Sequence, residues 1–208
     1  MQYIDYNKQN EWKTVTTWQS PVALNLETAI VVEEPKLDLK INLADQQNVE
    51  RVDWEIGPQF LATGTLNFKG QDYALVRFHF HDGSEHLLNG QRLAAELHFV
   101  FQNSTDLLVL GVLIQEDAAK DDLVAQLFSG ITHDVDLKEL LPVPVGRSYF
   151  EYIGTLTTPP LKQAIQTVIL QESITLSKAD LLAIHNAFPD NHRQIQPLNG
   201  RTVHLHQA

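Results

Sequence analysis

The sequence predicts a mainly β protein, a single domain over residues 1–208 built on a large, mostly antiparallel sheet with a few short helices. Three observations support this prediction. Short runs between residues 37 and 115 alternate apolar and polar side chains, and turn-forming residues separate them. Helical periodicity appears in only a few places. With 208 residues, 43% of them hydrophobic, the chain can bury one substantial core but not two.

The expected elements follow one another with clear boundaries. The predicted strands are Leu37–Leu43, Val49–Ile56, Gly64–Phe68, Tyr73–His81, Glu96–Gln102 and Leu107–Gln115. The predicted helices are Asp122–Phe128 and Ser177–Phe188, and Ser177 is expected to cap the second. Two prolines in Thr157–Pro160 predict a rigid loop.

The composition excludes several kinds of partner and ligand. A formal charge of −11 offers no basic surface for nucleic acid or an anionic membrane. No apolar run approaches the roughly 18 residues of a membrane span, and the first residues do not resemble a signal peptide. A cytoplasmic location is therefore expected, although a secreted chain with its signal removed would look the same. Because cysteine is absent, a transition metal must be held by nitrogen and oxygen.

Three histidines on two neighbouring strands predict a metal site. Alternation places His79 and His81 on one face of their strand, with phenylalanines on the other. Glu96 and His98 share one face of the later run, so pairing of the two strands would bring three imidazoles together. Three neutral imidazoles without a fourth protein ligand suit a catalytic zinc. An isolated His-x-His pair usually binds no metal, but the third histidine and the nearby carboxylates favour one here.

Four ordered segments resemble the α-class carbonic anhydrases. They are Gln19–Pro21, the region from His79 to Val100 with Ser84-Glu85-His86 inside it, Tyr152–Pro160, and Asn191–Arg201. The resemblance implies a central sheet of about ten strands with zinc at the floor of a conical cleft. It also implies a zinc lyase, a carbonate dehydratase that hydrates carbon dioxide reversibly to bicarbonate by zinc-bound hydroxide. The short loops are typical of bacterial members, and a homodimer is possible.

The resemblance also assigns roles to individual residues. His79, His81 and His98 correspond to the zinc ligands, and Thr157 and Glu85 to the catalytic pair that orients the metal-bound oxygen. The residues expected to support the site are Glu96, His86 and Asn191. The substrate pocket is expected to comprise Val100, Val109, Leu156, Thr158, Ile165 and Thr167. For any one of the apolar ones, Val100, Val109, Leu156 or Ile165, ordinary core packing is the better interpretation from the sequence alone.

Several positions depart from the family pattern. Arg77 stands where the family usually has glutamine, and a guanidinium cannot accept the ring N–H of His79. Thr167 replaces a tryptophan. The segment Trp54–Gln59, where the proton-shuttle histidine is expected, contains no histidine, so no shuttle is identified. Tyr6 matches the family's cleft tyrosine.

Two other interpretations remain open at this point. One is a catalytically impaired, carbonic-anhydrase-like binding protein, although such proteins typically lack a zinc histidine and this chain keeps all three. The other is a cupin-type metal oxygenase site, in which His79, His81 and Glu85 would hold iron or manganese. The cupin interpretation leaves the Thr157 loop unexplained.

Overall fold

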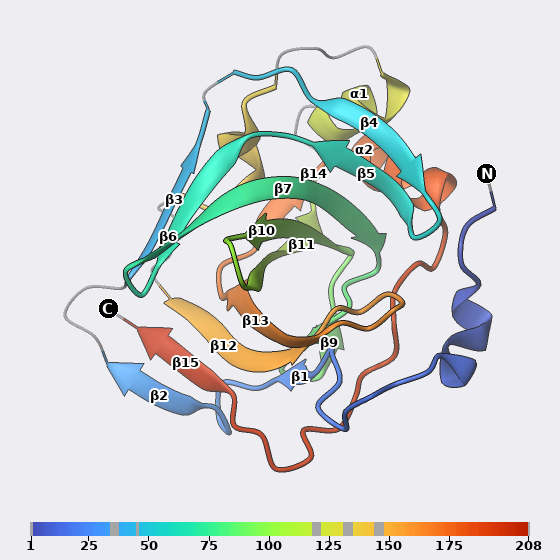
Figure 1. The fold of residues 1–208 in the computed structure, drawn as a ribbon. Helices are drawn as coiled ribbons and strands as arrows, with labels where there is room; N and C mark the ends of the chain where they lie inside the picture. The colour runs from blue at the N-terminus through green and yellow to red at the C-terminus, as the bar shows by residue number, and fades with distance from the viewer. Residues whose placement is uncertain are drawn as a thin grey trace.

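The computed structural model describes residues 2–33, 38–44, 46–117, 122–130, 135–143 and 148–207. Within these ranges the chain forms one sheet of 12 strands and a small three-stranded sheet, with short helices at the periphery (Figure 1). The main path of the large sheet runs β2-β15-β12-β13-β11-β10-β7-β5-β4, and β3, β6 and β14 pair beside it. Most pairs are antiparallel; β11 is parallel to β13 and β14, and β15 to β2.

The strands of the large sheet are β2 (Ile30–Glu33), β3 (Leu39–Leu43), β4 (Glu50–Trp54), β5 (Gly57–Leu61), β6 (Gly64–Phe68), β7 (Gln71–Asp82), β10 (Ala95–Gln102), β11 (Leu107–Glu116), β12 (Ser148–Thr155), β13 (Gln163–Leu170), β14 (Ile174–Leu176) and β15 (His204–Gln207). The small sheet comprises β1 (Ala23–Leu24), β8 (Leu87–Leu88) and β9 (Gln91–Arg92). The helices are α1 (Leu123–Ser129) and α2 (Lys178–Ala187), with 3-10 turns η1 (Tyr6–Glu11) and η2 (Leu137–Leu140).

The phenylalanines of β7 and β10 anchor the larger core on one face of the sheet. Phe78 is fully buried and stacks on Phe60 of β5 with ring centroids 5.1 Å apart, and it also contacts Phe99 across the β7–β10 pair. Burying such a side chain contributes about 1.5–3 kcal/mol. Because side chains alternate along a strand, packing these rings into the core directs the histidines between them to the opposite face.

The predicted fold class is confirmed, and several element boundaries are corrected. The sheet has 12 strands rather than about ten. The strand predicted over Val49–Ile56 was wrong at its end, because β4 stops at Trp54 and a tight turn leads into β5. Strands β2, β5 and β12 to β15 of the large sheet, and the three strands of the small sheet, were not predicted. The cap at Ser177 is confirmed, since its Oγ accepts from the backbone N–H of Asp180 at 3.0 Å. Leu37 lies outside the described residues.

Among the described helices, none combines the length and the apolar character needed to cross a membrane.

Candidate metal centre

Three imidazoles converge on the face of the sheet opposite the phenylalanines. His79 and His81 come from β7, and the register places His98 of β10 directly opposite His79. The ring centroids of the three histidines lie 4.9, 5.4 and 4.7 Å apart. One nitrogen from each ring lies within 4.8 Å of the others. The convergence predicted from the alternating pattern is therefore present.

Two of the three rings are held in a defined tautomer. The carbonyl oxygen of Asn191 lies 2.6 Å from Nδ1 of His81, and Oε1 of Glu96 lies 2.7 Å from Nε2 of His98. Both oxygens are acceptors, so these nitrogens carry the protons. The lone pairs are left on Nε2 of His81 and Nδ1 of His98. Such support is what metal-binding histidines generally receive.

Glu96 is a charged carboxylate in a fully buried position. Burial by itself would raise its pKa, but His86 and His98 hold the pKa well below its usual range. Oε1 of Glu96 accepts from Nδ1 of His86 at 2.7 Å, and Oε2 accepts from the backbone N–H of His86 at 2.8 Å. Nε2 of His86 lies 2.7 Å from the hydroxyl of Tyr152. This network fixes the carboxylate that orients His98.

His79 lacks an equivalent support. Its Nδ1 is buried and has no hydrogen-bond partner among the described residues. Arg77, two residues earlier on the same strand face, instead donates from Nε to Oε1 of Gln59 at 2.9 Å. Burial, followed by the neighbouring His81 and His98, lowers the pKa of His79 well below its usual value, and burial also lowers the pKa of His81. The lowered pKa values favour the neutral form of His79 and His81, which is the form that binds a metal.

The donor set fits a zinc ion. Nε2 of His81 and Oε2 of Glu85 are buried without a hydrogen-bond partner in the described part of the chain, and they lie 3.4 Å apart. Three imidazole nitrogens within 4.8 Å of one another, in a chain without cysteine thiolates, match the nitrogen ligands of catalytic zinc. The second histidine group, His86, Glu96 and His98, is occupied by its own hydrogen bonds. Oε2 of Glu85 also lies 3.9 Å from Nδ1 of His98, so this carboxylate faces two of the three imidazoles.

Glu85 follows β7 and Thr157 follows β12, so the two residues reach the site from different strands. Oε1 of Glu85 accepts from the backbone N–H of Arg193 at 2.8 Å, which leaves Oε2 available. Thr157 is buried and lines the same cavity as His79 and His98. A hydrogen bond from Thr157 to Glu85 is not present among the described residues.

The predicted pocket residues gather around the imidazoles. Val100, Val109, Leu156, Thr158 and Thr167 line the cavity, and Ile165 packs with the two valines in a small apolar cluster. The cavity is also lined by residues that were not predicted to belong to the pocket: Ser20, Arg77, His86, Tyr152 and Thr155. The lining therefore combines apolar side chains with threonines and Arg77.

The segment Trp54–Gln59 contributes no residue to the described lining of the cavity. The described histidines that line the cavity are His79, His86 and His98. His79 and His98 belong to the three converging imidazoles, and His86 is held by its hydrogen bonds to Glu96. Gly57 has a φ of +110°, and a Cβ there would lie 2.7 Å from the ring of Phe188. Trp54 is 39% exposed at the end of β4. His133 lies outside the described residues.

Arg193, Gln19 and Ser20 link separate segments around the site, and this role was not predicted. The guanidinium of Arg193 donates to Oε1 of Gln19 at 2.9 Å and to the carbonyl of Ser20 at 2.7 Å. Oγ of Ser20 accepts from the backbone N–H of Thr155 and lies 3.1 Å from the hydroxyl of Tyr152. These contacts join segments more than 130 residues apart, so no local spacing could have identified them.

The chain is similar to carbonic anhydrases in both sequence and structure. The model of the eukaryotic-type carbonic anhydrase family matches residues 7–207. A carbonic anhydrase of Klebsiella pneumoniae is 33% identical over 150 residues, which cover 67% of this chain but only 60% of that protein. A carbonic anhydrase of Pectobacterium atrosepticum is 31% identical over 198 residues, covering 89% of this chain and 78% of that protein.

Solved structures show the same similarity. The α-carbonic anhydrase of Thermovibrio ammonificans, in complex with the inhibitor sulfanilamide, superposes with a TM-score of 0.80 at 26% identity, covering 91% of this chain and 87% of that one. The α-carbonic anhydrase of Photobacterium profundum gives 0.79 at 26% identity, with 91% and 89% covered.

Proposed function

Because the chain belongs to the eukaryotic-type carbonic anhydrase family, we propose that it hydrates carbon dioxide reversibly to bicarbonate with a zinc ion held by His79, His81 and His98. The observation that carries this proposal is the convergence of the three imidazoles on a buried cavity, with the tautomers of His81 and His98 set by fixed acceptors. We also propose that residues 1–208 form a single domain.

The supporting residues keep the nitrogens in place. A bound zinc supplies a Lewis acid that activates water near neutral pH. Glu96 retains the Nε2 proton of His98, and the carbonyl of Asn191 retains the Nδ1 proton of His81, so that the opposite nitrogens stay unprotonated. The side chain of Asn191 accepts from the backbone N–H of Asp82 at 2.6 Å, which ties its carbonyl to the end of β7.

Thr157 and Glu85 would orient the attacking oxygen. Oε2 of Glu85 is buried, is unpartnered among the described residues and can accept the hydroxyl proton of Thr157. With its proton on that side, the Thr157 oxygen can only accept from the attacking water. A lone pair of that water is then directed at the substrate carbon. Positioning of this kind lowers the barrier because the geometry is arranged before reaction.

The cavity wall suits a small apolar substrate. Carbon dioxide has no hydrogen-bond donor and no charge, and the cluster of Val100, Val109 and Ile165 offers it an apolar surface beside His98. Thr167 makes the cavity lining more polar at its position than a tryptophan would. Since no histidine is available as a shuttle among the described cavity residues, we propose that protons leave through water or entering buffer.

Removal and return of the metal test this proposal. Stopped-flow hydration of carbon dioxide should be abolished after dialysis against a chelator and restored in proportion to added zinc, up to one equivalent per chain. Activity that is independent of metal content would refute the zinc-dependent mechanism. A protein that binds one zinc per chain but hydrates no carbon dioxide would instead be the impaired binding protein.

A further inference from the structure

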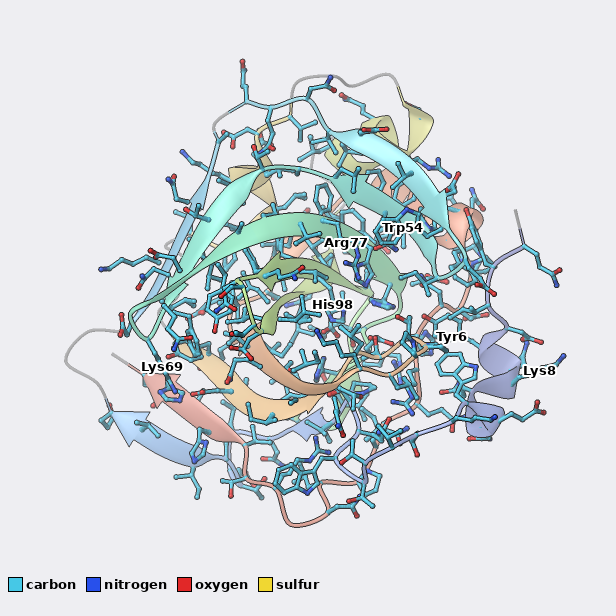
Figure 2. All side chains as sticks on the ribbon, in the orientation of Figure 1. Tyr6, Lys8, Trp54, Lys69, Arg77 and His98 are labelled. Carbon is cyan, nitrogen blue, oxygen red and sulfur yellow. The ribbon has the colours of Figure 1, made fainter. Side chains whose placement is uncertain are left out.

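Arg77 places a cationic group on the wall of the metal cavity. It lies on β7 two residues before His79, and the strand register sets it opposite Val100 of β10. It lines the same cavity as His79, His98 and Thr167. Figure 2 shows Arg77 near the centre of the molecule, close to His98 and beside Trp54.

Neighbouring residues hold the guanidinium in one orientation. Its Nε donates to Oε1 of Gln59 at 2.9 Å, and the carbon at its centre lies 5.1 Å from the centroid of the Trp54 ring. Gln59 is itself 1% exposed, and its amide nitrogen donates to the carbonyl of Pro58 at 3.0 Å. A guanidinium anchored through Nε and one face keeps its two terminal amino groups free to bind a ligand.

Those amino groups have no partner within the described chain. No carboxylate of the described residues lies within 4.0 Å of Arg77, whereas the guanidinium of Arg51 pairs with Asp53. Arg193 and Arg201 use their terminal amino groups on carbonyl and amide oxygens. Arg77 is half-buried, and its terminal amino groups are not among the buried polar atoms of the described residues, so they can reach a ligand in the cavity. Arg77 therefore stands out as a cation beside the reaction site that lacks an anion.

We propose that the terminal amino groups of Arg77 form an anion subsite of the cavity, which binds bicarbonate through two N–H donors. This inference rests on the proposed function for the identity of the ligand, although the subsite itself depends only on Arg77 and its supports. Bicarbonate is a planar monoanion whose oxygens match the guanidinium fork, and small carboxylates such as formate share this geometry. Carbon dioxide has no charge to offer.

The subsite should change the kinetics of bicarbonate, which is the anionic substrate in the dehydration direction. At a fixed pH, the equilibrium constant sets the ratio of kcat/KM in the two directions. A subsite that stabilises bound bicarbonate must therefore act on KM and kcat of dehydration together, and on inhibition by bicarbonate and formate. These quantities separate a binding role of Arg77 from a purely structural one.

The test compares Arg77→Met with Arg77→Lys, and with Lys8→Met as the matched control. Lys8 is an exposed side chain pointing away from the body of the molecule (Figure 2), so its loss removes one positive charge without touching the cavity. In the metal-free protein, the Nε–H resonance of Arg77 is followed by NMR as sodium bicarbonate, then formate, is added at constant ionic strength. A saturable shift is expected in the wild type and in Lys8→Met.

In the zinc-loaded protein, the KM for bicarbonate and the inhibition constant of formate should rise about tenfold or more in Arg77→Met. The increase should be smaller in Arg77→Lys, which keeps the charge but loses the fork. Unchanged constants in a folded Arg77→Met, or no saturable shift in the metal-free wild type, would overturn the subsite. If the wild type neither binds zinc nor hydrates carbon dioxide, the proposed function fails, and the metal-free titration still decides the subsite.

Discussion

Oε1 of Glu96 lies 2.7 Å from Nε2 of His98, and this contact determines which nitrogen of His98 faces the other two imidazoles. One residue separates Glu96 from His98 on β10, so the two side chains lie on the same face of the strand. The same oxygen also accepts from His86, so three N–H groups converge on one buried carboxylate. The orientation of a candidate ligand is therefore built into the strand itself.

Replacing this carboxylate by an amide tests its role. Glu96→Gln keeps the size of the side chain but turns one oxygen into an N–H donor, which conflicts with the donors that now converge there. Zinc affinity should fall by about 10- to 100-fold while the three ligands stay in place. Competition with a chromophoric chelator measures this change, with exposed Glu139→Gln as the control. Equal zinc affinity in both variants would show that Glu96 does not orient His98.

Thr157 is expected to affect rate and not metal content. Thr157→Ala removes both the donor to Glu85 and the acceptor for the attacking water, and it leaves the imidazoles untouched. Loss of one positioned hydrogen-bonding group typically costs about 100- to 1,000-fold in rate. Thr157→Ser keeps the hydroxyl and should recover much of the activity. Hydration kinetics and zinc analysis of both variants check this, and an alanine variant with wild-type kinetics would remove Thr157 from the mechanism.

The stability of the metal-free protein should depend on pH through its buried histidines. Burial lowers the pKa of both His79 and His81 below the unfolded value of 6.5. Below that value the unfolded chain binds more protons than the folded chain, so the free energy of unfolding should fall as the pH is lowered. Each histidine can contribute a slope of up to about 1.4 kcal/mol per pH unit.

Urea unfolding of the metal-free wild type and of His79→Gln, from about pH 8 to about pH 5, measures this slope. The free energy of unfolding is highest above the unfolded pKa of the histidines. It decreases as the pH falls from the unfolded pKa toward the folded pKa. The variant has one titrating ring fewer, so its slope should be smaller. Parallel curves for the two proteins would mean that the pKa of His79 is not lowered in the folded state.

Export of the proton should limit turnover in dilute buffer. A histidine with a pKa near 6.5 is the natural relay, and none stands at the expected position. Turnover should therefore rise markedly with added imidazole. Trp54→His should reduce this dependence, with Trp54→Phe as the control for loss of the indole. Gly57 is a poorer position, because its positive φ and the ring of Phe188 exclude a side chain. High turnover with no response to imidazole would reveal another proton-transfer group.

The sequence predicted the part of the site that depends on local alternation. His79, His81 and His98 fall on one face because strands have a period of two, and the phenylalanines between them select that face by entering the core. Strand β5 was missed because Gly57 and Pro58 at its start are unusual in a strand interior. Strand β13 is almost continuously apolar near its end, a pattern that periodicity alone does not assign.

The remaining contacts depend on tertiary structure. The backbone N–H of Arg193 reaches Glu85 across 108 residues of sequence, and the carbonyl of Asn191 reaches His81 across 110. No spacing rule connects such positions. The partner of Arg77 was likewise hidden, because Gln59 belongs to the strand that was not predicted.

The most direct test of the account is the zinc content of His98→Ala, measured beside its carbon dioxide hydration rate. His98 is the one ligand that comes from β10, so its loss leaves two imidazoles on β7 and opens the site. Both zinc retention and hydration should be lost, whereas His185→Ala, which changes an exposed histidine outside the cavity, should keep one zinc per chain and full activity. A His98→Ala protein that retains one tightly bound zinc per chain would contradict the assignment.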